Sequence, residues 1–511
     1  MNHTPTALKE SRMMTLQRAI PCFRFLKRVA EQTNVLRHAD VRHLLFAGAA
    51  CLSVAVRAAE VSNKPNILFL YTDDQTFDSI RALGNREVRT PNIDRLASSG
   101  AVFRNCYNQG GWHGAVCVAS RTMLNTGRFL WEACALEPNL RSEAAQHRLW
   151  PQLMRQAGYH TRMTGKWHVT GVQPADLFDE VRHVRPGMPA SCDAAYERPK
   201  LGEPDLWQPW DESRGGHWQG GRHWSAVTAD DAIAFLEKPS PDGKPFFIYA
   251  AFNAPHDPRQ SPKAFADLYP PDTIALPPNF MPTNPYKDAI GCAHTLRDEK
   301  LAPDPRTPRA VQTHRAEYYA LITYLDQQIG RVLEALEKSG QAANTVVFLT
   351  GDNGLSVGQH GFMGKQNMFE HSMKVPLLAA GPGIPKGTTI DAPVYLQDVL
   401  PTTLELAGAA IPPQVRFKSL LPLLRDGRAS HYDAIYGAYM NLQRMLRVGD
   451  MKLIWYPKPN VFLLFDLAKD PHELNDLAAD PSRAAALLGL KERLARFQKE
   501  VNDPCPPPAP K

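Results

Sequence analysis

Short apolar runs recur along the chain, each ending in polar residues, and amphipathic stretches separate them. A continuous apolar run of this length predicts a strand that is covered on both faces, as in a parallel sheet. The predicted strands of the main sheet are 66–71, 101–107, 159–163, 246–252, 345–350 and 376–380. Helix periodicity or start signals predict helices from Pro91, over 150–157, over 229–237 with Thr228 as the cap, through 318–336, and up to Gly408. The pattern predicts an α/β fold with a central, mostly parallel sheet flanked by helices.

A different pattern follows residues 409–414, which are typical of a linker. Shorter strand-like runs lie at 433–436, 443–448, 452–456 and 462–466, before a helix over 482–501. This order predicts a smaller C-terminal α+β subdomain with an antiparallel sheet and a terminal helix. The proline-rich end, 504–511, is predicted to be a disordered tail.

The N-terminal segment has the composition of a leader. An uncharged run at 44–56 follows Arg37 and Arg42, which is typical of a secretory signal, and the run is short for a bilayer span. We therefore expect a leader over 1–58 and a periplasmic or secreted mature chain without a membrane span; a transit peptide is the alternative. The net charge is +6, but residues 1–58 hold nine Lys/Arg and three Asp/Glu, which leaves 49 of each sign. Because the positive and negative charges of the remaining chain are equal in number, the net charge does not indicate a nucleic-acid partner.

Oxygen-bearing side chains stand directly after two of the predicted strands. Asp73 and Asp74 follow the first strand, and Asp352 and Asn353 follow the strand that begins at residue 345. In open α/β sheets ligands bind beyond the carboxyl ends of the strands. Such ligands favour Ca²⁺ or Mg²⁺ over zinc. The alternative for the first pair is that one aspartate caps a helix and the other lies at the surface.

The most distinctive phrase is C-V-A-S-R at residues 117–121, followed by an apolar turn and a Gly-Arg stop. It resembles the C-x-P/A-x-R element of the type I sulfatases, with Ala119 where many members carry proline. In that family a maturation enzyme oxidises the cysteine to formylglycine, so the resemblance implies such an enzyme as a partner acting on Cys117. The alternative is an ordinary buried cysteine beside a surface arginine.

Further phrases occur in the order of the same family, over about residues 62–500. They are T-P-N-I-D-R-L at 90–96, G-K-W-H at 165–168, A-P-H at 254–256, D-N-G at 352–354 and G-K at 364–365. The resemblance implies an alkaline-phosphatase-like fold. It divides the chain into a leader (1–58), a sulfatase catalytic domain (62–410), a C-terminal subdomain (411–503) and the tail (504–511).

The resemblance also implies roles for individual residues. Cys117, as hydrated formylglycine, would attack sulfur and form a covalent sulfo-enzyme, which the second hydroxyl then releases. One divalent cation, Ca²⁺ or else Mg²⁺, would be held by Asp73, Asp74, Asp352, Asn353 and residue 117. Arg121 and His168 would hold the hydrate. Sulfate would be bound by Lys166, Lys365 and His256, and His256 would also protonate the leaving alcohol.

The substrate is predicted to be a carbohydrate sulfate ester. The long segment 170–226 is rich in tryptophan, and indole faces suit sugar rings; the alternative is that these side chains anchor the loop to the core. Candidate substrate-binding residues are Trp112, His113, Asp257, His360, Gln443 and Arg444.

Two other functions remain open from the sequence. One is a phosphomonoester or phosphonate hydrolase of the same superfamily, to be separated by comparing phosphate and sulfate hydrolysis rates. The other is a non-catalytic protein that binds sulfated glycans and releases no sulfate.

Overall fold

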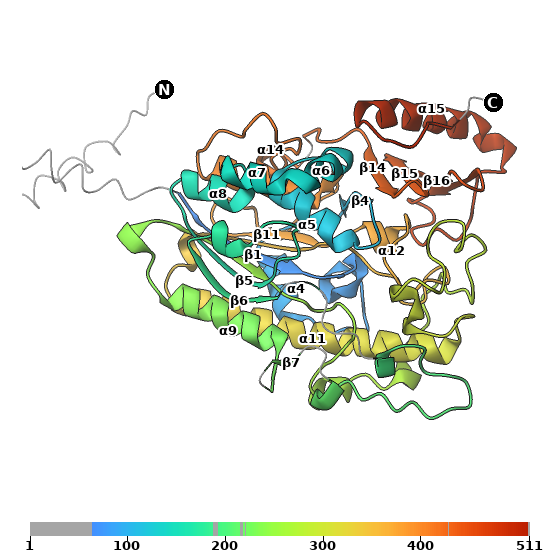
Figure 1. Cartoon of the computed structure of the whole chain (residues 1–511), viewed down its shortest axis with the longest axis horizontal. Coiled ribbons are helices and arrows are strands. Elements are labelled where there is room, and N and C mark those ends of the chain that lie inside the picture. The colour runs from blue at the N-terminus through green and yellow to red at the C-terminus, as the bar shows by residue number, and fades with distance from the viewer. Residues whose placement is uncertain are drawn as a thin grey trace, which may run out of the picture. The chain divides into compact units, whose positions relative to one another are not determined.

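An eight-stranded sheet lies at the centre of the described chain (Figure 1). The computed structural model describes residues 64–508 except 186, 188–192, 215–217, 220 and 428, so the predicted leader lies outside the described residues. In their order across the sheet, the strands are β12 (Thr388–Ile390), β2 (Ala101–Phe103), β11 (Leu377–Ala380), β10 (Thr345–Gly351), β1 (Asn66–Thr72), β9 (Phe246–Ala251), β5 (His160–Lys166) and β6 (Glu180–Arg185). β11 is antiparallel to both neighbours and the other pairs are parallel, which confirms the predicted α/β fold.

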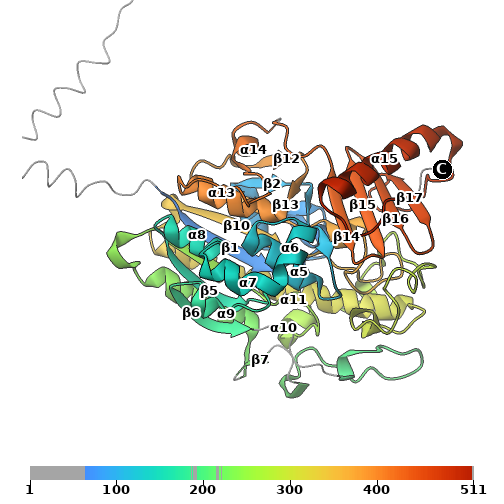
Figure 2. The same ribbon diagram turned by 45° about the horizontal axis from the view of Figure 1, so that its top comes forward.

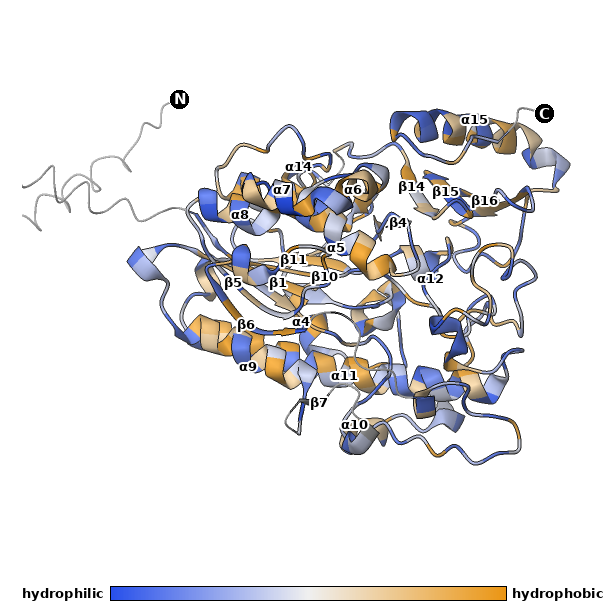
Figure 3. Cartoon of the chain, in the orientation of Figure 1, coloured by the Kyte–Doolittle hydropathy of each residue, from blue (hydrophilic) through white to orange (hydrophobic). Residues whose placement is uncertain are grey.

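Alternate side chains of each central strand enter two separate cores. In β1, Phe69 and Tyr71 lie in one apolar cluster, and Leu68 and Leu70 lie in another. The first core is closed mainly by α7 (Leu140–Ala145), α8 (Trp150–Gln156), α13 (Val399–Leu406) and α14 (Leu421–Arg425). The second core is closed by α4 (Pro91–Ser99), α9 (Trp224–Glu237) and α11 (Pro308–Lys338). Figures 1 and 2 show these helix layers on opposite sides of the sheet, and Figure 3 shows polar and apolar residues mixed along α9 and α11.

Two helices begin with residue types that favour helix starts, and a third begins earlier than predicted. Pro91 begins α4, and Thr307 caps α11 by accepting a hydrogen bond from the backbone of Ala310. The predicted cap at Thr228 is wrong, because α9 begins at Trp224. The His223 side chain provides the cap instead, accepting from the backbone of Ser225.

A second sheet contains the C-terminal strands and one strand from the first part of the chain. Its order is β17 (Val461–Asp466), β16 (Met451–Tyr456), β15 (Gln443–Val448), β14 (Ile435–Tyr439) and β4 (Gly110–Gly111). The helix α15 (Ala484–Glu500) packs on it. β4 pairs in parallel with β14, so the loop that precedes Cys117 is part of this sheet. The disordered tail predicted from residue 504 is corrected for Cys505, which is buried in the same core.

The remaining elements are short. They are β3 (Cys106–Tyr107), β7 (Trp218–Gln219), β8 (Arg222–His223), β13 (Val394–Tyr395), α5 (Val116–Thr126), α6 (Leu130–Leu136), α10 (Lys263–Ala266) and α12 (Glu370–Met373). Among the helices of the described ranges, none has the length and apolar character that a bilayer crossing requires.

Candidate active site

Cys117 lies in the first turn of α5, with its side chain buried. Its Sγ is 3.3 Å from Asp73 Oδ1, 3.5 Å from Asp74 Oδ1 and 3.0 Å from Lys365 Nζ. Burial and the neighbouring carboxylates raise the pKa of the thiol well above its ordinary value. The unmodified thiol is therefore a poor nucleophile here, since the thiolate is the reactive form.

The carboxylates meet because β1 and β10 are adjacent parallel strands in matching register. Thr72 pairs with Gly351, so the residues after each strand lie side by side. The backbone N–H of Asp74 donates to Asp352 Oδ1 at 3.0 Å, and Asp74 has a left-handed φ of 62°. The paired strand ends bring together the four oxygen-bearing residues that the sequence indicated.

These residues fit a divalent cation. Ligand atoms of Asp73, Asp74, Cys117 and His256 all lie within 4.8 Å of one another. Burial and, after it, the neighbouring Asp73 raise the pKa of Asp352 to about 6, and a cation beside this buried carboxylate would stabilise its charged form. Asn353 Oδ1 is buried and has no hydrogen-bond partner among the described residues. Oxygen ligands of this kind suit Ca²⁺ or Mg²⁺.

Three basic side chains neutralise the three aspartates. Lys166, at the end of β5, pairs with Asp73, and Lys365 Nζ lies 2.5 Å from Asp74 Oδ2. Arg121, one turn along α5 from the cysteine, places Nε 2.9 Å from Asp352 Oδ2. In addition, Arg121 donates to the backbone oxygen of Lys166 at 2.8 Å and lies over the Tyr71 ring.

Two histidines lie at the same end of the sheet. His256 follows β9, and its Nε2 is 3.4 Å from Asp74 Oδ2 and 3.2 Å from Lys365 Nζ. His168 follows β5 with a φ of 54°, is half-buried, and has an Nδ1 with no partner in the part of the chain that the structure describes. Burial and the charge of Lys166 lower the pKa of His168 to about 2, so its imidazole is neutral.

Asp257 connects His256 to a residue that the sequence reasoning missed. Its Oδ1 is 3.1 Å from His256 Nδ1, and Arg297 donates to both of its carboxylate oxygens, at 2.7 and 3.3 Å. Tyr196 also donates to Asp257, at 3.2 Å. Arg297 lies within the proline-rich, irregular segment 258–310, where no periodicity or motif marked it.

Other predicted substrate residues fall into two groups. Trp112 and His113 are half-buried on the loop before Cys117, next to Glu137. His360, by contrast, is buried and stacks on Phe369 with ring centroids 3.9 Å apart, so its ring is used in packing.

Gln443 and Arg444, two further candidates for substrate binding, are both buried on β15. Gln443 donates to the backbone of Gln366 at 2.7 Å, which fixes the residue next to Lys365. Arg444 makes a bidentate pair with Asp503, both bonds at 2.6 Å, inside the C-terminal core. These contacts use the Arg444 guanidinium and the Gln443 Nε2 within the fold, whereas Gln443 Oε1 is buried without a partner among the described residues.

The tryptophans of segment 170–226 whose surroundings are described pack against the protein. Trp207 and Trp224 are buried, with Arg198 over the Trp207 ring. Trp210 is half-buried and lies under Lys263. The anchoring alternative therefore accounts for these three side chains.

Comparisons with known proteins bear on both parts of the described chain. A family model described as Sulfatase matches residues 65–409, and one described as N-sulphoglucosamine sulphohydrolase, C-terminal, matches residues 358–500. The N-acetylglucosamine-6-O-sulfatase of Bacteroides thetaiotaomicron is 27% identical over 90% of this chain and 91% of its own length.

Solved structures share the fold at low sequence identity. A protein in complex with its substrate D-glucosamine-2-N,6-O-disulfate has a TM-score of 0.68 at 24% identity, over 88% of this chain and all of that chain. The phosphonate monoester hydrolase of Agrobacterium radiobacter has a TM-score of 0.66 at 22% identity, over 86% and 96%. At these identities the two structures support the architecture and no more.

Proposed function

The chain belongs to the sulfatase family of sulfuric ester hydrolases, and we propose that it removes sulfate from a sulfated saccharide. We further propose that a formylglycine made by oxidation of Cys117 is the nucleophile, and that a sulfatase-maturing enzyme makes it. The observation that carries this proposal is the position of Cys117 Sγ, within 3.5 Å of Asp73, Asp74 and Lys365.

The surrounding residues fit the transfer of a sulfuryl group. Hydrated formylglycine supplies two hydroxyls on one carbon, one to attack sulfur and one whose ionisation releases sulfate. Asp73, Asp74, Asp352 and Asn353 would hold Ca²⁺, which would supply positive charge to the sulfate oxygens. Lys166 and Lys365 bind the same oxygens and stabilise the negative charge that develops as the ester bond breaks.

Proton transfer to the leaving group is assigned to His256. Its Nδ1 is held by Asp257, which leaves Nε2 directed to the side where Lys365 and Asp74 lie. A proton given from Nε2 to the ester oxygen lets the sugar leave as an alcohol. Arg121 orients Asp352, and neutral His168 accepts or donates a hydrogen bond at the hydrate.

A saccharide substrate is supported by the relatives rather than by the tryptophan-rich loop. One relative is named for N-acetylglucosamine 6-O-sulfate, and one neighbouring structure holds a disulfated glucosamine. Export of the mature chain to the periplasm or medium is proposed from the leader composition alone. A phosphonate or phosphate ester is the second candidate, because a phosphonate monoester hydrolase shares the fold.

The nucleophile is tested by mass spectrometry of the tryptic peptide 105–121, from protein co-expressed with a maturing enzyme. We expect the mass of formylglycine at residue 117, and its capture by a hydrazide. An intact thiol that alkylates under these conditions would reject the nucleophile and favour the glycan-binding alternative.

The reaction is tested by ion chromatography of the anion released from sulfated saccharides, p-nitrocatechol sulfate and matched phosphate and phosphonate esters. We expect sulfate release from a saccharide to have the highest kcat/KM. Turnover of aryl or choline sulfates alone would reject the saccharide, and faster phosphonate hydrolysis would favour the second candidate.

A further inference from the structure

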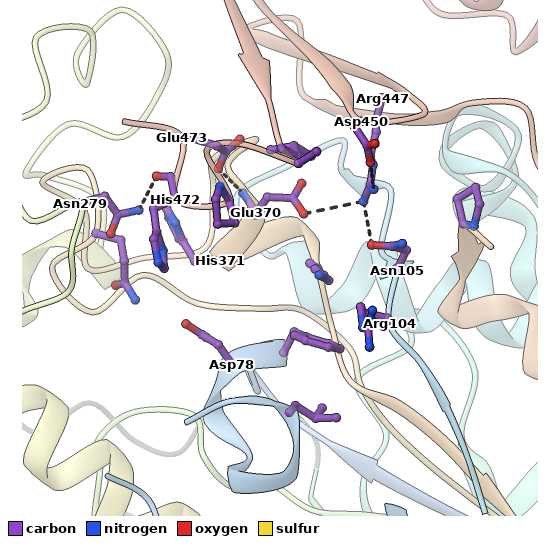
Figure 4. Close-up of a pocket in the computed structure, with 18 of the residues that line it drawn as sticks. Asp78, Arg104, Asn105, Asn279, Glu370, His371, Arg447, Asp450, His472 and Glu473 are labelled. Carbon is purple, nitrogen blue, oxygen red and sulfur yellow. Dashed lines mark hydrogen bonds and ion pairs between the residues drawn. The ribbon is translucent and has the colours of Figure 1, made fainter. Parts of the chain in front are cut away.

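A second cavity, of about 730 Å³, lies between the main sheet and the C-terminal sheet (Figure 4). None of the residues assigned above to the nucleophile, the cation or sulfate lines it. Its outer residues, such as Arg104, Asp391 and Asp450, are exposed, whereas Asn279 and His371 are buried. The cavity thus opens to solvent at one end and reaches into the protein at the other.

The buried end holds polar atoms that the fold leaves unused. Asn279 donates its Nδ2 to the backbone of His472 at 3.0 Å, but its Oδ1 has no partner within the described ranges. His371 stacks against Phe369, and its Nε2 is also unpartnered there. Their side chains are 7% and 8% exposed. Both atoms are covered by neighbouring groups, so they close the inner end of the cavity and do not contact a ligand there.

One basic side chain of the cavity makes no ion pair with a described carboxylate, although Glu370 and Asp78 lie near enough to influence its charge. Lys374 Nζ lies 4.2 Å from the centre of the Phe77 ring, and no carboxylate oxygen of a described residue lies within 4.0 Å of it. Arg104 is instead paired with Asp391 at 3.0 Å, and Arg447 donates to Asn105 at 2.9 Å. Lys374 is therefore the group available to an anionic substituent.

The walls suit a sugar ring. Phe77 and the prolines 277, 278, 393 and 471 offer flat apolar surfaces, which pack against the C–H faces of sugars. The lining also contains carboxylates such as Asp78 and Asp433 and basic side chains such as Arg104 and Arg447, so it offers both acceptors and donors. Hydroxyl groups, which donate and accept at once, match such a mixed lining. The volume is that of an ordinary small-ligand site.

We propose that this cavity is a second saccharide-binding site, separate from the site of hydrolysis, and that it takes a sugar bearing a sulfate or carboxylate group. Lys374 binds the anionic substituent, Phe77 and the prolines pack against the ring, and carboxylates of the lining such as Asp78 and Asp433 accept hydrogen bonds from hydroxyls. This assignment goes beyond the proposed reaction and does not depend on it, because binding is measured without turnover.

The test uses the full chain with the Lys365→Ala change, which weakens sulfate binding at the active site. Because this change breaks the buried pair with Asp74, urea unfolding first verifies that the variant is folded under the binding conditions. The probe is N-acetylglucosamine 6-sulfate, followed by saturation-transfer NMR and calorimetry. We expect binding to persist in this background and to weaken at least fivefold on adding Lys374→Gln. Lys386→Gln, an exposed lysine outside the cavity, is the matched control and should leave binding unchanged.

A second variant blocks the entrance without touching the core. Ala468 is exposed and lines the cavity, so Ala468→Trp should remove binding, whereas Lys469→Trp, on the neighbouring exposed residue outside the lining, should not.

Three results would overturn the site. They are loss of all binding in the Lys365→Ala background, unchanged binding in both Lys374→Gln and Ala468→Trp, and equal affinity for inorganic sulfate and the sulfated sugar. The first two leave no ligand in the cavity, and the third makes it a plain anion site. Sulfate release by the protein with Lys365 intact is measured separately, so failure of the proposed reaction is recognised independently.

Discussion

Three buried acid–base pairs define the active site at the scale of single residues. Lys166, Lys365 and Arg121 each neutralise one aspartate, and all six side chains are 5% exposed or less. Breaking such a pair leaves an uncompensated buried charge, which costs about 3–5 kcal/mol. The charged side chains proposed for the reaction are therefore also needed for a stable fold. For variants of these residues, the loss of activity must be compared with the loss of unfolding free energy.

Arg297 is expected to act through His256. Because Arg297 holds Asp257, which holds His256 Nδ1, Arg297→Met should lower kcat about tenfold, a fraction of what general acid catalysis contributes, with little change in KM. Steady-state kinetics with p-nitrocatechol sulfate check this. Arg309→Met, on an exposed arginine paired with Asp272, is the matched control. A rise in KM at unchanged kcat would instead indicate direct substrate binding by Arg297.

Removal of the divalent cation should lower stability as well as activity. A bound cation stabilises the charged form of Asp352, whose pKa is raised by burial and by Asp73, so dialysis against a chelator should lower the unfolding temperature. Calcium at about a hundred times its Kd should restore about 2.7 kcal/mol, measured by calorimetry. Asp73→Asn should respond much less to calcium. An unfolding temperature that is insensitive to chelator and calcium would contradict the site.

At the scale of elements, the site was predictable where it follows strand ends. The apolar runs of β1 and β10 are each followed by their ligands, and the parallel pairing of Thr72 with Gly351 explains why they meet. Lys166 is the last residue of β5, and His256 follows β9. Arg297 was missed because it lies in an irregular segment, where only the fold brings it to Asp257. The burial of Arg444 could not be read from sequence because its partner, Asp503, is 59 residues away.

The short strand β4 should not tolerate a side chain at Gly110. Its φ is 85°, and a Cβ there would lie 2.1 Å from the backbone oxygen of Ala438. Gly110→Ala should therefore separate β4 from β14, with a loss of about 2–4 kcal/mol of unfolding free energy and most of the activity. Denaturant unfolding and kinetics measure both.

Gly84→Ala is the control for this change. Its φ of 121° is also in the glycine-favoured region, but no atom lies within 4 Å of the added Cβ. Equal losses in the two variants would mean that backbone strain alone, rather than contact with Ala438, sets the effect.

At the scale of the whole molecule, the main body and the C-terminal sheet are joined by buried charge. Lys452, on β16, is paired with Glu370 of α12 at 2.9 Å and with Glu473 at 2.7 Å. Burial raises the pKa of Glu473 from 4.5 to about 7, while Glu370, although burial opposes it, is held at a pKa of about 2 by Lys452. One ammonium thus serves two carboxylates, of which Glu370 is the charged partner.

The stability of this junction should depend on pH through Glu473. Folded chain binds the proton more tightly than unfolded chain, so this group stabilises fully below about pH 4.5, and the contribution is lost as pH rises through 7. Between about pH 5 and 8 the parent should lose about 1–3 kcal/mol of unfolding free energy relative to Glu473→Gln. Urea unfolding at both pH values checks this, with exposed Glu500→Gln as the control. A constant difference would contradict the raised pKa.

The pairing of β4 with β14 limits how such enzymes can be recombined. A chimera that takes everything after residue 410 from a related sulfatase is cut at the predicted linker. The exchange nevertheless replaces β14, the strand that pairs with residues 110–111. The new sheet would have to reproduce the close approach of the backbone at Gly110 to Ala438. Otherwise the loop before Cys117, and Cys117 with it, would be displaced. A successful exchange of C-terminal halves should therefore carry the matching segment ahead of Cys117 with it, so that two distant stretches of gene are inherited together.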